Sequence, residues 1–142
     1  MKTIMIAGLA LTALALGTAT AHAEDAKVKD ACIAAEQTID QVKTWKALYT
    51  YSKTYGCDNG GVAEGISDKV SQLMVHDWAS LSSVSAKIRS DASFSTFVLK
   101  HVDETWSRDD LDTAKQNAAA HCPKGLDAFC KSLVAEANDA EK

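Results

Sequence analysis

VAEGISDKVSQLMVHDW, residues 62–78, is the stretch that decides the fold class of this chain. Its apolar side chains recur every three or four residues, which places them on one face of an α-helix. A strand would alternate apolar and polar residues, and no segment of the chain does so for long. The stretch therefore predicts a helix with one wide buried stripe, made of Val62, Ile66, Val70, Leu73, Met74 and Trp78.

The segment before this helix repeats the same spacing. Apolar side chains from Val42 to Tyr55 predict a helix over about residues 40–55. Thr38 and Gln41 have the spacing of a capping box, in which two side chains satisfy backbone N–H groups at the start of a helix. A second helix is therefore expected to precede the central one.

Further helices are predicted after the central one. A serine-rich segment keeps a short apolar face, and a longer helix over about residues 94–106 is capped by Asp91 or Ser93. Ser107 and the carboxylates behind it suit the start of another helix, because they satisfy and complement its free N–H groups. Pro123 ends that helix and opens the last one. The prediction is an all-α fold, a compact bundle of about five or six helices.

Residues 1–23 have the layout of a cleavable signal peptide. Lys2 precedes an apolar stretch from Ile4 to Leu16, and the segment ends in the small-residue site Ala21-His22-Ala23. The apolar stretch is shorter than the roughly 20 residues of a membrane span, and no Cys lies at the cleavage point to carry a lipid. We therefore expect export without a membrane anchor, and a single helical domain over residues 24–142.

The charge of the chain argues against nucleic acid as a partner. The formal charge of −4 becomes −5 when Lys2 is removed with the signal peptide, and no cluster of Lys and Arg follows. The residues that could hold a metal come only in pairs, His101 with Glu104 and Glu64 with Asp68, where a site needs three or four ligands. The sequence therefore predicts no metal and no cofactor.

The four cysteines form an even set, which in an exported chain predicts two disulfides. Cys122 and Cys130 flank a turn between helices, where a short Cα separation is available. Pairing Cys32 with Cys57 then requires the chain to reverse between about residues 33 and 41, because one continuous helix would hold them about 35 Å apart. Pairing Cys32 with Cys122 or Cys130 stays open.

Two titratable side chains, Asp77 and His101, fall on apolar helix faces when residues are counted at about 100° each. Because buried polar groups need partners, we expect these two to face each other or to share a hydrogen bond with a Trp or Tyr. The pair would also suit the base of a catalytic triad. However, no free Cys remains after two disulfides and no Ser lies in a nucleophile elbow. A structural role is favoured, with no catalytic residue and no enzymatic activity.

Two junctions between helices are candidates for contact with a partner. The glycine-rich run 55–61 predicts an exposed turn, and the start of the later helix at Ser107 carries further charges. Both could also be no more than solvated connections. The candidate residues are Asp58, Asn59, Gly60 and Glu64 in the first segment, and Arg108, Asp109 and Asp110 in the second.

In its signal peptide, all-α pattern and small disulfide-closed domain, the chain resembles the periplasmic immunity proteins that protect Gram-negative bacteria from type VI secretion effectors. The resemblance lies in this overall profile. It implies a periplasmic inhibitor that occludes the cleft of a secreted hydrolase or toxin without doing chemistry. Residues 58–68 and 97–103 also resemble small exported bacterial proteins with no established function. The alternative is an envelope stress protein, or a small-ligand binder that uses the space between its helices.

Overall fold

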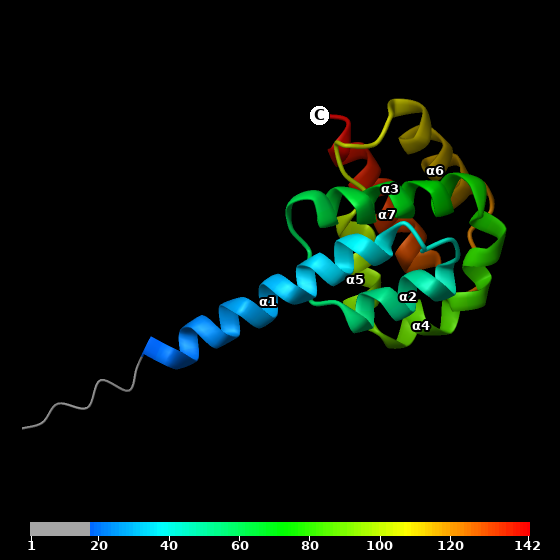
Figure 1. The fold of residues 1–142 in the computed structure, drawn as a ribbon. Coiled ribbons are helices and arrows are strands. Elements are labelled where there is room, and N and C mark those ends of the chain that lie inside the picture. Colours follow the sequence, from blue (N-terminus) through cyan, green and yellow to red (C-terminus); the bar gives the residue numbers. More distant parts are fainter. Residues whose placement is uncertain (1–17) are drawn as a thin grey trace, which may run out of the picture.

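The computed structural model describes residues 18–142, with side chains from residue 27 onward (Figure 1). The predicted all-α fold is confirmed: this part of the chain holds seven α-helices, one 3-10 helix and no strand, slightly more helices than expected. Most of the predicted signal peptide lies outside the described residues, and its cleavage site falls within the first helix. The elements are α1 (Thr18–Ile39), α2 (Trp45–Thr54), α3 (Gly60–His76), the 3-10 helix η1 (Trp78–Val84), α4 (Ser85–Ser90), α5 (Ala92–Lys100), α6 (Arg108–Ala120) and α7 (Asp127–Ala140).

Both preferred disulfides are present, and they exclude the alternative pairings. Cys32 joins Cys57 with a Cα separation of 5.0 Å, and Cys122 joins Cys130 with a separation of 6.1 Å. The predicted chain reversal follows the end of α1 at Ile39, where a turn leads back toward α2. Figure 1 shows α1 projecting from the bundle, with only its C-terminal part packed against the other helices.

The start of α2 differs from the prediction. Thr38 belongs to the last turn of α1, where its hydroxyl donates to the Ala34 carbonyl at 2.7 Å, so it does not cap a following helix. Instead Thr44 caps α2, accepting a hydrogen bond from the Ala47 N–H at 3.1 Å. The capping-box assignment was wrong because a second threonine, at the true boundary, competes for the same role.

The central helix α3 lies within the core as predicted. All six residues of the predicted stripe are buried, although Trp78 belongs to η1. Gly65 lets α1 approach α3 closely, because a Cβ at this position would lie 3.2 Å from Ile39 Cγ2. The core gathers apolar side chains from every helix of the bundle.

The later helices begin where their caps predict, with shorter extents. Asp91 caps α5 through the Phe94 N–H at 3.2 Å, and Ser107 caps α6 through the Asp110 N–H at 3.1 Å. Helix α5 ends at Lys100, so the predicted helix 94–106 is too long and its part after Lys100 is irregular. Likewise, α7 begins four residues after Pro123. The fold is thus the predicted bundle with longer connections.

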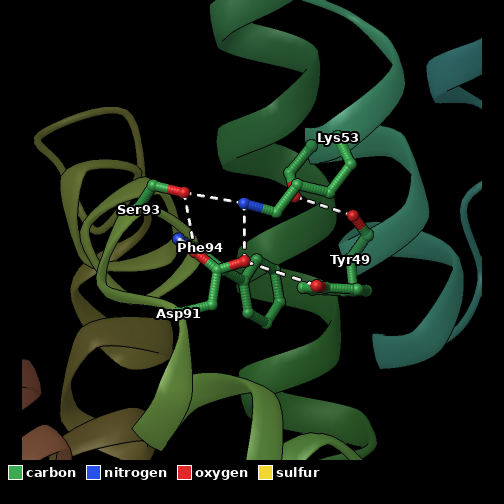
Figure 2. A network of polar contacts seen from close by, with 6 residues as sticks. Tyr49, Lys53, Asp91, Ser93 and Phe94 are labelled. Carbon is green, nitrogen blue, oxygen red and sulfur yellow. Dashed lines mark hydrogen bonds and ion pairs between the residues drawn. The ribbon is translucent and has the colours of Figure 1, made fainter.

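A polar network joins α2 to the start of α5 (Figure 2). The Lys53 ammonium lies 2.6 Å from Asp91 Oδ2 and donates to the Ser93 hydroxyl at 2.7 Å. Ser93 in turn donates to Asp91 Oδ1 at 2.7 Å, and the Tyr49 hydroxyl donates to Oδ2 at 3.3 Å. Hydrogen bonds from Lys53 and then Ser93 hold the pKa of Asp91 well below its usual range. The cap of α5 is therefore also its link to α2.

Asp91→Ala should lower Tm by about 5 °C at pH 7, and Asp91→Asn by less, because an asparagine can still cap the helix. Since the folded-state pKa of Asp91 is lowered, its contribution is present above about pH 4 and is lost as pH falls further. The Tm difference should therefore shrink on acidification. Asp139→Ala, which removes only a local pair with Lys142, is the matched control for thermal melts. A pH-independent difference would contradict the role of the carboxylate.

Candidate functional site

Residues from the two predicted junctions meet in one pocket. Glu64 on α3 and Asp110 on α6 both line a cavity of about 180 Å³, together with Asp68. Helices α3 and α6 pack side by side, and this packing brings the two segments together. We call this cavity the acidic pocket; its walls are Glu64, Asp68, Ser71, Thr105, Trp106, Ser107 and Asp110.

The three carboxylates of the acidic pocket differ in how far they are already paired. Asp68 Oδ2 accepts a hydrogen bond from Gln72 at 2.9 Å and lies 3.2 Å from the Lys69 ammonium. Asp110 receives only a long contact from the Ser71 hydroxyl, at 3.4 Å. Glu64 is exposed and pairs with no side chain of the described residues. Glu64 and Asp110 therefore keep most of their capacity to bind a cation or a donor.

Trp106 forms part of the wall of the acidic pocket and has an unmet hydrogen bond. It is 7% exposed, and its indole Nε1 finds no acceptor among the described residues. The other two tryptophans are satisfied: Trp45 donates to the Asp77 carbonyl at 3.1 Å, and Trp78 to that of His121 at 2.9 Å. A buried N–H without an acceptor costs about 1–3 kcal/mol, so this donor is the exception among three.

The remaining residues of the predicted partner surface lie elsewhere. Asp58 is turned inward, with its side chain 25% exposed, and pairs with Lys100 and His101, so the turn is less open than expected. Its neighbour Cys57 is buried in the core. Four further candidates are exposed but do not line the acidic pocket: Asn59, Gly60, Arg108 and Asp109.

His101 is buried as predicted, at 2% exposure, but its predicted pairing with Asp77 is wrong. Asp77 is the residue at which α3 ends, with φ −132° and ψ 31°, so counting at the helical period beyond His76 misplaces its side chain. Its carboxylate is only half-buried and accepts from the Ser80 hydroxyl at 2.7 Å. His101 instead takes its partners from the Asp58 turn and from Ser67 on α3.

The buried set Ser67, His101 and Asp58 has the residue types of a catalytic triad. Ser67 Oγ lies 3.1 Å from His101 Nδ1, and His101 Nε2 lies 3.1 Å from Asp58 Oδ1. However, Ser67 is only 1% exposed and donates its proton to Asp103 at 2.6 Å. This set therefore offers no accessible nucleophile.

Comparisons with known proteins indicate no function for this chain. No family model matches the chain, and searches of curated proteins and of solved structures find no match. Within residues 18–142 no helix combines the length and the apolar character needed to cross a membrane. In the same part of the chain, no three His, Cys, Asp or Glu side chains group together in a way that could hold a metal ion.

Five residues of the acidic pocket were not among the predicted contact residues, and three of them come from one segment. Thr105, Trp106 and Ser107 belong to the irregular connection between α5 and α6, which the apolar spacing had assigned largely to a helix. Asp68 and Ser71 follow Glu64 on the same helix, at four and seven residues. The helical period therefore carried the signal for those two, whereas in the connection only Ser107 was marked, as the cap of the next helix.

Trp106→Phe should lower the free energy of unfolding by about 1 kcal/mol less than Trp78→Phe does. The reason is that only Trp78→Phe leaves a carbonyl, that of His121, without its hydrogen-bond donor. The two side chains are matched controls for each other, at 7% and 8% exposure. Urea denaturation of both variants measures the difference. Equal losses would mean that the Trp106 indole has an acceptor in the folded protein.

Proposed function

We propose that this chain is an exported binding protein that inhibits a secreted hydrolase by occluding its cleft, as the resemblance to periplasmic immunity proteins implies. The acidic pocket is the observation that supports this most. It combines two carboxylates with little internal pairing, Glu64 and Asp110, and the unsatisfied indole N–H of Trp106. These groups offer binding capacity that the fold itself does not use.

The size of the acidic pocket favours a side chain of a protein over a free ligand. Pockets for drug-sized molecules enclose roughly 300–1,000 Å³, and this one encloses about 180 Å³. A Lys or Arg of the partner would find its counter-charges in Glu64 and Asp110. Arg fits such a pair of carboxylates best, because its planar guanidinium can donate to both.

The two disulfides agree with such a role. Bonds of this kind persist in oxidising compartments, which suggests an exported protein. They also make a small domain rigid, and rigidity lowers the entropic cost of occluding a cleft. Placement in the periplasm remains part of this proposal.

Charge reversal at the pocket tests the proposal. The protein without residues 1–23 is used to capture a partner from a panel of secreted hydrolases, and the affinity of the captured pair is measured by calorimetry. Glu64→Lys together with Asp110→Lys should weaken binding by about 100-fold or more, since each places like charges opposite a cation. Glu136→Lys on the exposed face of α7 is the matched control. Inhibition that survives the double reversal would exclude the acidic pocket as the contact.

A second cavity favours the alternative function, binding of a small ligand. It encloses about 310 Å³ between α4, α5 and α7, with an apolar floor that includes Ile88 and Phe129 and with Arg89 at its edge. Arg89 Nη1 lies 2.7 Å from where a Cβ of residue 125 would be, and Gly125 has φ +81°, so only glycine lets the guanidinium lie there. No carboxylate lines this cleft. A small organic anion with an apolar body would match it.

Octanoate is a suitable probe for this cleft. With about ten non-hydrogen atoms at roughly 0.4 kcal/mol each, it should bind with a Kd of about 1 mM. Arg89→Gln should weaken binding about tenfold, whereas Arg108→Gln, away from the cleft, should not. Chemical-shift titration of the mature protein measures both. Equal binding of octylamine, its cationic counterpart, would argue against an anion site.

A further inference from the structure

A buried chain of polar contacts links the Asp58 turn, α3 and the end of α5. Asp58 Oδ1 lies 3.1 Å from His101 Nε2, and His101 Nδ1 lies 3.1 Å from Ser67 Oγ. The Ser67 hydroxyl then lies 2.6 Å from Asp103 Oδ2. These are three contacts in series between two carboxylates.

The direction of the last contact is fixed by Asp103. Its other oxygen accepts from the backbone N–H of Thr105 at 3.0 Å and from the Thr105 hydroxyl. Burial alone would raise the pKa of Asp103, but the hydrogen bonds from Ser67 and Thr105 outweigh it and lower the pKa. Asp103 is therefore an ionised acceptor, and the Ser67 proton is committed to it.

Counting protons along this chain shows that one is missing. Three contacts need three protons, whereas a neutral imidazole and one hydroxyl supply two. Ser67 Oγ and His101 Nδ1 form a hydrogen bond, whereas His101 Nε2 and Asp58 Oδ1 do not. Since Ser67 donates to Asp103, we assign the ring proton to Nδ1, and the lone pair of Nε2 then faces Asp58 Oδ1. These two atoms are buried and have no hydrogen bond in the described chain, despite their 3.1 Å separation.

We propose that His101 Nε2 and Asp58 Oδ1 form a binding site for one proton, which makes the attachment of the Asp58 turn to α5 sensitive to pH. With the site empty, His101 is the neutral Nδ1–H tautomer. With the site filled, the ring is an imidazolium between the carboxylates of Asp58 and Asp103.

The charges around the ring decide when the site fills. Lys100 pairs with the second oxygen of Asp58, and the Phe97 ring packs against His101 in an edge-on arrangement, with the ring centroids 5.1 Å apart. Burial, the largest influence, lowers the pKa of His101 below 6.5; Asp58 and Asp103 oppose it, and Lys100 adds to it. The site is therefore empty at neutral pH and fills only in acid.

The sign of the pH effect follows from this lowered pKa. Any state that exposes His101 to water takes up the proton more readily than the closed network does. The contribution of the network to stability is therefore complete above about pH 6.5 and declines as pH falls toward the folded-state pKa. Acidification favours release of the Asp58 turn from α5.

Asp58→Asn is the most telling variant, because its side-chain N–H₂ can donate to His101 Nε2 while its oxygen stays with Lys100. It supplies the missing hydrogen to the neutral ring. We expect Asp58→Asn to melt several degrees above Asp58→Ala at pH 7, and to move the His101 titration to lower pH than in the unmodified protein.

Nitrogen-detected NMR of the full mature chain provides the direct test. At pH 8, His101 should be protonated at Nδ1 and bare at Nε2, with exposed His76 and His121 as internal references. On acidification from pH 8, its titration should have a midpoint below 6.5. An Nε2–H tautomer at pH 8, a midpoint above 6.5, or Asp58→Asn melting no higher than Asp58→Ala would each overturn the proposal.

Discussion

The Cys32–Cys57 disulfide is the constraint on which the rest of the structure depends. Its two cysteines are separated by 25 residues, and closing a loop of that length removes about 3.5 kcal/mol of chain entropy from the unfolded state. The bond requires α1 and α2 to form a reversal, and the close approach of Ile39 to Gly65 then seats the end of α1 on α3. It also brings the segment after Cys57 back into the bundle, which is why Asp58 faces inward.

Helix α3 contributes to two polar sites from neighbouring positions on one face. Ser67 joins the buried network that includes Asp58 and His101, whereas Glu64 reaches the acidic pocket shared with α6. The helix is therefore both the middle of the core and the common wall of the two polar sites. Since Ser67 lies between Glu64 and Asp68 on the same helix, a shift of the acidic pocket relative to the buried network would displace α3 within the core.

The sequence predicted those features that depend on neighbours along the chain. The apolar stripes, the caps at Asp91 and Ser107 and the preferred cysteine pairing follow from helical period, hydrogen-bonding capacity and reach. The prediction for the Asp77 side chain was wrong because the helical period was continued one residue past the end of α3. The prediction of a partner for His101 was wrong for another reason. Its actual partner, Asp58, lies in a turn that only the folded chain brings near, and no periodicity in the sequence encodes such a contact.

The unsatisfied polar groups have one feature in common. Among the described residues, three buried side-chain atoms lack hydrogen bonds, and they belong to Asp58, His101 and Trp106. Two of these residues lie in the connection between α5 and α6, and the third contacts its first residue. A core this small loses a large part of its stability to a few such groups. Their concentration in one connection, beside the acidic pocket where Glu64 and Asp110 meet, is the observation that the proposed partner site and the proposed proton site share.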